Sequence, residues 1–298
     1  MDDAAVVRPP GAEHELVLSV DVITPIVDDP VLFGAIAAKN ALSDIYAMGA
    51  QPQLALSFVG MPEVVELDVL AAVLQGVQQA CAEASCTIVG GHSIRDSEPK
   101  VGLTVIGSVA PGQAWTHQGA QPGQLVVLSK ALGTGLIAHA VKAGKAIDGA
   151  LEAATASMLL SNAAACTAGL ESDVRAATDV TGFGLLGHLS HILRESGVGA
   201  RVFADRVPLL SGALEAAAAD CVPGGTKRNR SYVDGWLSGT QQLDPARLTA
   251  LVDAQTSGGL LLVVDAPRAD ALLAALGAPA AIVAEITDAA GKIELTSG

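Results

Sequence analysis

The sequence predicts a mixed α/β protein of two domains. Strand-like and helix-like segments alternate along its N-terminal part, and 298 residues are enough for two domains that each bury a core. Hydrophobic residues make up 50% of the chain but aromatic residues only 3%. We therefore expect cores built from Ala, Val, Leu and Ile at helical and strand periods.

The N-terminal part shows this alternation most clearly. Asp29 and Pro30 are typical of a helix start and Gly49 of a helix end, which predicts a helix from Pro30 to about Met48. Strands are expected at 16–20, 53–59, 87–89 and 101–109, and a second helix at 67–84. The pair Gly90-Gly91 follows the third of these strands, where we expect a glycine loop.

Residues 111–123 contain Gly, Pro, Gln and Thr without an apolar period, which predicts a linker. We place the boundary near Gly112, giving an N-terminal domain 1–112 and a C-terminal domain 113–298. In the second domain, strands are expected at 125–128, 175–180, 200–203, 259–264 and 282–286. Helices are expected there at 136–143, 151–170, 185–195, 214–218, 245–252 and 267–276.

The chain is strongly acidic, with 31 Asp and Glu against 17 Lys and Arg and a net charge of −14. Such a surface repels phosphate backbones and anionic lipids, so neither nucleic acid nor membrane is an expected partner. No segment resembles a membrane span or a signal peptide, which predicts a cytoplasmic location. Four cysteines without CxxC spacing are expected to be buried thiols: Cys81, Cys86, Cys166 and Cys221.

Carboxylates stand at positions that suit a divalent cation. Asp21 ends a predicted strand, and Asn40 and Asp44 lie four apart on a predicted helix, so both side chains share one face. Magnesium prefers such oxygen ligands and binds nucleotides through one or two carboxylates and the phosphates. Taken alone, the pattern is more often a solvated helix edge, and Asp21 alone is typical of a turn residue at a strand end.

Several glycine-bearing segments carry polar side chains. Gly90-Gly91-His92-Ser93 and the stretch from Asp179 to Gly184 would let backbone N–H groups approach a phosphate, although ordinary turns have the same composition. Two further loops are expected at 223–229 and 255–259. Lys227, Arg228 and Arg230 form the one local basic patch, whose natural ligand is phosphate and whose commoner role is a solvated loop.

Seven segments together resemble the selenophosphate synthetase family, within the superfamily of aminoimidazole-ribonucleotide synthetases. In order along the chain they read DDAAVV from Asp2, TPIVDDP from Thr24, NALSDIYAMGA from Asn40, GGHSIRDSEPKVGL from Gly90, TDVTGFGLLGHL from Thr178, VPGGTKRN from Val222 and DAQTSGGLLL from Asp253. They cover nearly the whole chain, and the combination is specific.

The resemblance implies a fold, a reaction and a set of site residues. The fold is an N-terminal α/β domain that closes a β-barrel with its twin across a homodimer, followed by a C-terminal α+β domain. The reaction is ATP plus selenide plus water giving selenophosphate, AMP and orthophosphate. Magnesium ligands implied by the match are Asp3, Asp44 and Asp179. ATP contacts implied are Asp3, Asp21, Asp44, Gly91, His92 and Ser93, with Asn40, Thr181, Lys227 and Arg228 as helpers.

The chain departs from the family pattern at its start. Family members carry a cysteine or selenocysteine and a lysine upstream of the DDAAV word, and Met1 stands where that segment would already have passed. The expected catalytic residues would thus lie upstream of Met1, and we expect this chain to bind magnesium-ATP with impaired turnover. Two alternatives stay open: another superfamily enzyme, such as aminoimidazole-ribonucleotide synthetase or thiamine-phosphate kinase, and a non-catalytic nucleotide-binding dimer.

Overall fold

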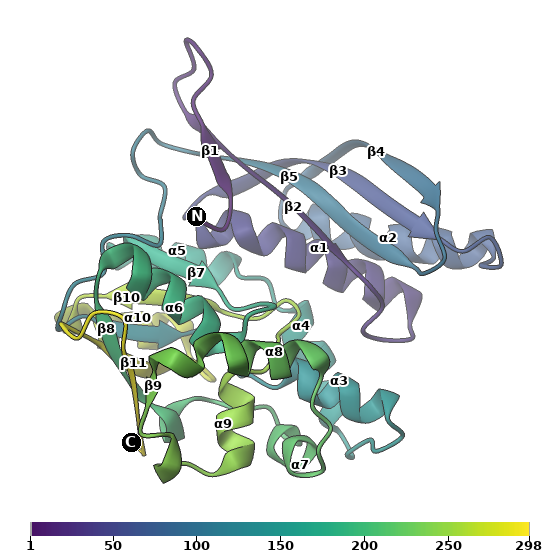
Figure 1. The fold of residues 1–298 in the computed structure, drawn as a ribbon. Helices are drawn as coiled ribbons and strands as arrows, with labels where there is room; N and C mark the ends of the chain where they lie inside the picture. Colours follow the sequence, from purple (N-terminus) through teal and green to yellow (C-terminus); the bar gives the residue numbers. More distant parts are fainter. Residues whose placement is uncertain (1, 298) are drawn as a thin grey trace. The chain divides into compact units, whose positions relative to one another are not determined.

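A computed structural model describes residues 2–297 and divides the chain into two units. The N-terminal unit comprises Asp2–Ala114 and a short later segment, Met158–Ala163. The C-terminal unit comprises Trp115–Ser157 and, of the described residues, 164–297. Both are mixtures of helices and strands (Figure 1), so the predicted α/β class is confirmed.

The N-terminal unit is built on a five-stranded sheet with the order β1-β2-β5-β3-β4 among the described residues. The strands are β1 (Ala5–Val7), β2 (Glu15–Ile23), β3 (Gln51–Met61), β4 (Thr87–Arg95) and β5 (Lys100–Val109). The β3–β4 pair is parallel and the other pairs are antiparallel. A parallel neighbour requires a crossover connection, and the helix between β3 and β4 supplies it.

Two helices cover one face of this sheet, as Figure 1 shows: α1 (Pro30–Ala47) and α2 (Leu67–Glu83). The start of α1 follows the sequence prediction, because the Asp29 carboxylate accepts the Leu32 N–H at 2.9 Å and Pro30 occupies the first turn. Nearly all of α1 is buried, including Ile36 and Ile45. It therefore forms the centre of the N-terminal core.

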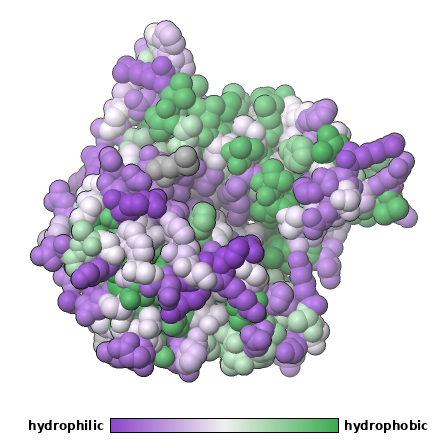
Figure 2. All heavy atoms as spheres, viewed as in Figure 1, coloured by the Kyte–Doolittle hydropathy of each residue, from purple (hydrophilic) through white to green (hydrophobic). Residues whose placement is uncertain are grey.

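The opposite face of the same sheet is open and apolar. Side chains alternate along β2, so Val17 is buried under the helices while Val20 and Val22 are 65% and 40% exposed. On β3, Leu54 and Leu56 are 40% and 44% exposed. Figure 2 shows hydrophobic side chains gathered over this unit. An exposed patch of this kind is typical of an interaction surface.

The C-terminal unit contains a seven-stranded sheet with the order β7-β10-β6-β11-β8-β12-β9, counted over the described residues. Its strands are β6 (Leu125–Leu128), β7 (Ala176–Asp179), β8 (Gly199–Phe203), β9 (Leu237–Ser238), β10 (Leu260–Val264), β11 (Ala281–Thr287) and β12 (Ile293–Thr296). Its helices are α3 (Thr134–Lys142), α4 (Ala150–Leu159), α5 (Ala163–Glu171), α6 (Gly184–Ser196), α7 (Ala213–Ala218), α8 (Gly224–Val233), α9 (Pro245–Leu251) and α10 (Ala269–Leu276).

The main core of this unit lies between the sheet and α6. Leu186, Leu189 and Leu193 recur at helical spacing on α6 and join a cluster that contains Val126 of β6 and Leu261 of β10. The helix ends where Gly197 takes a left-handed conformation with φ of 69°. This packing fixes the position of the α6 N-terminus, which follows a predicted site residue, Asp179.

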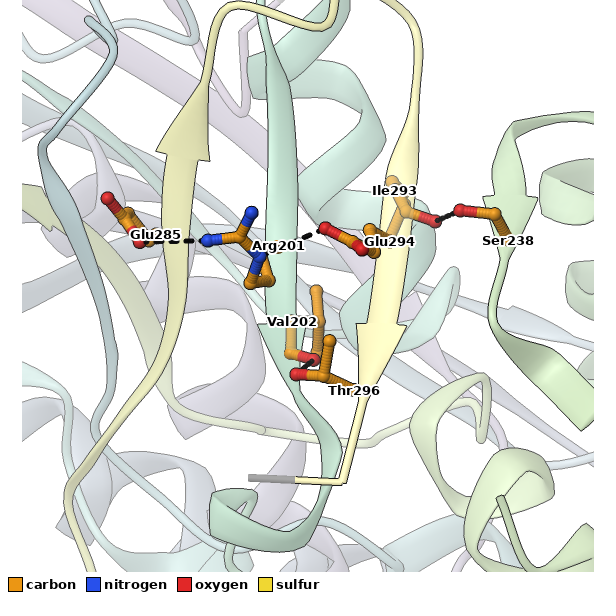
Figure 3. Close-up of polar contacts among 7 residues, drawn as sticks. All are labelled: Arg201, Val202, Ser238, Glu285, Ile293, Glu294 and Thr296. Atoms are coloured by element: carbon orange, nitrogen blue, oxygen red, sulfur yellow. Dashed lines mark hydrogen bonds and ion pairs between the residues drawn. The ribbon is translucent and has the colours of Figure 1, made fainter. Parts of the chain in front are cut away.

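The solvent side of the same sheet carries a charge ladder, drawn in Figure 3. Arg201 on β8 lies opposite Glu285 of β11 and Glu294 of β12 in the strand register. Its guanidinium is 3.6 Å from the first carboxylate and 2.9 Å from the second. Exposed ion pairs of this kind contribute about 0–1 kcal/mol each to stability. The ladder therefore identifies the solvent-exposed face of the sheet, and most of the stability comes from the buried core.

Three predicted elements are wrong in extent or kind. β4 continues to Arg95, so the expected glycine loop at Gly90-Gly91 is an edge strand paired with β3. The loop expected at 223–229 is part of helix α8. The helix expected at 151–170 is two helices, α4 and α5, separated by residues 160–162. Strands β1, β9 and β12 were not predicted.

The break between α4 and α5 has a local cause. The Ser161 hydroxyl accepts the Ala163 N–H at 3.2 Å, which offers the backbone an alternative to continued helix. The Asn162 amide donates to the hydroxyl of Ser43 on α1 at 2.9 Å, and both side chains are buried. This contact groups the segment with the N-terminal unit. None of the helices between residues 2 and 297 is long and apolar enough to cross a bilayer.

Candidate functional site

The N-terminal unit brings a set of carboxylates and amides together between β2 and α1. The Asn40 amide donates to the Asp21 carboxylate at 2.7 Å, and the Ser19 hydroxyl donates to Asp44. Ser19 and Asp21 are two apart on a strand, so they point to the same side, toward α1. Asn40 and Asp44 are four apart on α1 and both meet β2, as their helical spacing predicts.

Burial determines the electrostatics of this group. It raises the pKa of the Asp21 carboxyl from 3.8 to about 6, while the hydrogen bond from Asn40 acts in the opposite direction. The ionised form is therefore costly in the protein alone. A cation beside Asp21 would remove part of that cost, which is the behaviour expected of a carboxylate that receives a metal-bound ligand.

The other predicted residues of this unit are placed differently. Asp3 is half-buried and lies just before β1. Gly91, His92 and Ser93 lie within β4, at the edge of the sheet, and all three are exposed. A Cβ added to Gly91 would stand 2.2 Å from the Ser57 carbonyl oxygen on β3, so glycine is needed there for strand packing.

In the C-terminal unit, Asp179 is the last residue of β7 and is 1% exposed. The Thr181 hydroxyl lies 3.5 Å from its Oδ1. The loop that follows leads into α6 at Gly184, whose φ is 68°. A Cβ at this position would lie 2.7 Å from the backbone of Val252. The strand-to-helix junction predicted at this segment is confirmed, with glycine required at the turn.

His188 orders this junction and was not predicted. Its Nε2 accepts the Thr181 N–H at 3.1 Å and the Phe183 N–H at 3.4 Å, while Nδ1 faces the Thr178 hydroxyl at 3.3 Å. A ring nitrogen that accepts carries no proton, so the geometry fits the neutral imidazole with its proton on Nδ1. The sequence signal was its position one helical turn after Gly184, in the word GLLGH.

A second carboxylate of this unit, Asp253, is completely buried and surrounded by donors. It accepts the Thr226 hydroxyl at 2.8 Å, the Gln255 amide at 3.0 Å and the Leu136 N–H at 3.1 Å. Burial raises the pKa of Asp253 from 3.8 to about 6, and these hydrogen bonds oppose the shift. Asp253 therefore joins α8 to the N-terminus of α3.

Gln255 completes that junction. Its Oε1 accepts the Gly133 N–H at 2.9 Å, the Thr134 N–H at 3.1 Å and the Thr134 hydroxyl at 3.1 Å. The first N–H groups of a helix have no partner within the helix, and Gln255 supplies one for α3. The polar residues of the segment 253–255 thus serve internal hydrogen bonds, an arrangement that no sequence period reveals.

The basic patch lies on α8, which is a helix where a loop was expected. Arg230 pairs with Asp234 one turn later at 3.0 Å. Lys227 and Arg228 are exposed, and within residues 2–297 neither side chain forms an ion pair. The helix forms despite Gly224 and Gly225 because tertiary hydrogen bonds hold it.

The structure thus gathers Asp21, Asn40 and Asp44 in one group. Asp3 and residues 91–93 belong to the same N-terminal unit, whereas Asp179, Thr181, Lys227 and Arg228 belong to the C-terminal unit. In the N-terminal unit, the carboxylates have a fixed orientation and the pKa of one of them is raised by burial, which suits a metal-bound phosphate compound. In the C-terminal unit, a glycine turn precedes a helix N-terminus, which also suits a phosphate group.

Comparisons with known proteins identify relatives along the whole chain. Two family models match: AIR synthase related protein, N-terminal domain, over residues 1–109, and its C-terminal domain over residues 121–295. A selenide, water dikinase of Myxococcus xanthus (strain DK1622) is 44% identical over 297 residues, covering 98% of this chain and 83% of the relative. One of Carboxydothermus hydrogenoformans is 40% identical over 295 residues, covering 98% and 85%.

Solved structures share the fold. The hydrogenase maturation protein HypE, in a crystal structure with ATP, superposes with a TM-score of 0.71 and 21% sequence identity. The match covers 99% of this chain and 84% of that one. At this level of identity the likeness establishes the fold alone.

Proposed function

Because the chain belongs to the selenide, water dikinase family, we propose that its activity is the ATP-dependent synthesis of selenophosphate from selenide and water, with release of AMP and orthophosphate. The observation that carries this proposal is the identity of 40% and 44% to two selenide, water dikinases over 98% of the chain. A match of that length includes both units. A cytoplasmic location, expected from the sequence, stays a prediction.

Magnesium-ATP is the proposed form of the nucleotide, with Asp3 and Asp44 as magnesium ligands in the N-terminal unit. The donor chemistry fits: the oxygen of Asp44 is oriented by Ser19, and that of Asp21 by Asn40. The raised pKa of Asp21 supports its assignment to the nucleotide contact, because a nearby cation would offset the cost of its charge. Bound magnesium would supply charge neutralisation for the phosphates.

Asp179 is proposed as a further magnesium ligand on its own local geometry. It ends a strand directly before a turn and the N-terminus of α6, a setting that favours anionic groups and their metals. Thr181 stands beside it as a helper. We also propose phosphate contacts for Lys227 and Arg228, supported by their exposure and lack of ion-pair partners in the described part of the chain.

The exposed main chain of β4 supports a nucleotide contact at Gly91, His92 and Ser93. This strand is an edge, so one side of its backbone has no neighbouring strand among the described residues. Gly91 itself is needed for packing against β3, so the proposed contact uses the exposed side of the strand and the side chains of His92 and Ser93. The proposed role differs from the sequence expectation in one respect: the donors come from an extended strand.

A homodimer is the proposed assembly, with the open face of the N-terminal sheet as its interface. Val20, Val22, Leu54 and Leu56 are all at least 40% exposed on that face. At about 25 cal/mol per Å² of apolar surface, covering such a patch is strongly favourable. A second copy presents the same patch, so a two-fold axis would place the two identical patches against each other.

The reaction is tested by phosphorus NMR of ATP with selenide and magnesium. The chain would be assayed as it stands and with a family-type N-terminal segment that carries the cysteine or selenocysteine and the lysine. Selenophosphate, AMP and orthophosphate are the expected products. ADP as the product would favour another superfamily reaction, and ATP binding without turnover in both proteins would favour the non-catalytic dimer.

The assigned carboxylates are tested by titration calorimetry of magnesium-ATP with Asp44→Asn and Asp179→Asn. Each substitution keeps the shape and removes a negative charge, so affinity should fall about tenfold, or 1.4 kcal/mol. Asp288→Asn, at an exposed loop position, is the matched control and should bind like the unchanged chain. Equal affinities in all four proteins would contradict the assignment.

The interface is tested by sedimentation with Leu56→Lys. A charge on the open face should convert the dimer to a monomer of 29.9 kDa. The matched control is Val64→Lys, because Val64 is 90% exposed in the turn after β3, outside the sheet. If the unsubstituted chain sediments as a monomer, the proposed homodimer is wrong, and the proposed reaction is not affected by that result.

A further inference from the structure

The C-terminal end of α2 places two cysteines side by side. Ser85 takes a left-handed conformation with φ of 53°. The Cys86 N–H then bonds the Cys81 carbonyl at 2.9 Å, and the Ser85 N–H bonds the Ala82 carbonyl at 3.0 Å. These two bonds define a Schellman motif, in which the side chains at the first and last positions contact each other. Here both of those side chains are thiols.

The two thiols interact directly and are chemically unequal. Both are free and buried, at 1% and 4% exposure. The hydrogen bond from Cys81 lowers the pKa of the Cys86 thiol. The same hydrogen bond, followed by burial, raises the pKa of Cys81. The Lys39 ammonium acts in the opposite direction on Cys81 and is itself paired with Glu83. Cys86 is therefore the sulfur that becomes a thiolate first.

A pocket of about 600 Å³ opens onto both sulfur-bearing residues. Its walls come from α2, β3 and the start of β4, and they include Leu74, Gln78 and Ser57. One water molecule occupies about 30 Å³ of liquid, so the pocket admits a small polar reagent. Low exposure of the two side chains does not isolate them, because they form part of the pocket wall.

We propose that Cys81 and Cys86 are a modification site that closes to a disulfide when it meets hydrogen peroxide. The Cys86 thiolate attacks one peroxide oxygen, the O–O bond breaks, and hydroxide leaves and takes up the proton released by Cys86 to form water. Cys86 is then a sulfenic acid. The Cys81 sulfur attacks the Cys86 sulfur, the S–O bond breaks, and the Cys81 proton leaves with the hydroxide as a second water. Two thiols and one peroxide thus give one disulfide and two waters.

Backbone geometry supports ring closure between these residues. A disulfide needs Cα atoms within about 4.4–6.8 Å of each other and side chains that point together. The hydrogen bond from the Cys86 N–H to the Cys81 carbonyl holds the two backbones together, and both residues line the same pocket. Cys166 contrasts with Cys86, because burial raises the pKa of the Cys166 thiol to about 12 and so disfavours its thiolate.

The test treats the full chain with graded hydrogen peroxide, alkylates the remaining thiols with N-ethylmaleimide after denaturation, and cleaves with Glu-C protease. Glu83 lies between the two cysteines, so cleavage after it leaves their peptides joined only if a disulfide is present. We expect that joined product, its reversal by dithiothreitol and full alkylation of Cys166 and Cys221. Absence of the joined product at peroxide levels that oxidise free cysteine would overturn the proposal.

Variants separate the two roles. Cys81→Ser should leave a Cys86 sulfenic acid that dimedone traps, whereas Cys86→Ser should form neither product. Cys166→Ser is the matched control and should give as much disulfide as the unchanged chain. Phenylarsine oxide, which binds two adjacent thiols together, gives a readout without substitution: it should bind one per chain and block the peroxide reaction. Equal peroxide reactivity of Cys86 and Cys166 would also contradict the site.

Discussion

Burial raises the pKa of the carboxyl groups of both Asp21 and Asp253 to about 6, yet the surroundings of these two residues differ. Asp21 is half-buried and accepts one side-chain hydrogen bond, from Asn40. Asp253 has no exposed surface and accepts donors from Thr226, Gln255 and Leu136. A carboxylate has about four acceptor positions. The comparison teaches that a raised pKa does not by itself mark a ligand site. What sets Asp21 apart from Asp253 is that it is less buried and accepts fewer hydrogen bonds.

The substitution Asp253→Ala should have the largest effect and tests the difference between the two carboxylates most directly. It leaves the Thr226 hydroxyl, the Gln255 amide and the Leu136 N–H buried without their acceptor, each at about 1–3 kcal/mol. We expect a loss of at least about 3 kcal/mol in the stability of the C-terminal unit. Thermal unfolding followed by circular dichroism measures it. Asp21→Ala should lower the midpoint far less, and equal losses would remove the distinction.

The pH dependence of stability is the next largest effect. The folded-state pKa of Asp253 lies above the unfolded value, so the folded state holds the extra proton between pH 4 and 6. Stability from this group is therefore present below the unfolded pKa and is lost as pH rises through about 6, by about 3 kcal/mol. Asp253→Asn should remove that part of the slope of the thermal midpoint against pH. Asp288→Asn should keep it, and an unchanged slope in Asp253→Asn would show that another group titrates.

A smaller effect is expected from Asp21→Asn, and it should appear in binding. The Asn40 amide can still donate to the carbonyl oxygen of the new side chain, so the thermal midpoint should change little. Magnesium-ATP affinity should fall about tenfold, or 1.4 kcal/mol, because a negative charge opposite a cation is lost. Calorimetric titration measures this. A large loss of stability with unchanged affinity would place Asp21 in the same class as Asp253.

The smallest expected effect is that of Ser19→Ala. The hydroxyl only orients Asp44, and the carboxylate keeps its charge without it. A single neutral donor to a carboxylate contributes about 1 kcal/mol, so affinity for magnesium-ATP should fall less than fivefold. The same titration decides. A loss as large as that of Asp21→Asn would mean that orientation of Asp44 matters as much as charge.

Local signals in the sequence predicted part of the fold correctly. Asp29 and Pro30 identify the start of α1 because capping involves only neighbouring residues. Gly90-Gly91 and Gly224-Gly225 misled in the same way, since two glycines usually indicate a loop. In the structure, β3 pairs with the first segment, while Thr226 and Asn229 anchor the second through Asp253 and the carbonyls of Gly182 and Val252. These partners are distant in sequence, so no local pattern contains them.

The candidate site shows the same division. Helical spacing predicted that Asn40 and Asp44 share a face, and both meet β2. That Ser19 supports Asp44 depends on how β2 packs on α1, which spacing along one helix cannot give. His188 and Asp253 belong to segments that carry the family resemblance, yet both form hydrogen bonds inside the C-terminal unit. Polar residues near glycines indicate places where backbone segments approach one another closely. Only the fold shows whether these polar groups bind a ligand or other groups of the protein.

The break between α4 and α5 has a consequence for how the protein is made. Residues 158–163 complete the N-terminal unit, and Asn162 donates to the buried Ser43 on α1. The ribosome synthesises the chain from its N-terminus, so residues 158–163 of this unit become available only after the residues that follow Ala114 have been translated. We expect a fragment that ends at Ala114 to lack the contact between Asn162 and Ser43. Packing of the N-terminal unit is therefore expected to be complete only after residues 158–163 have been synthesised.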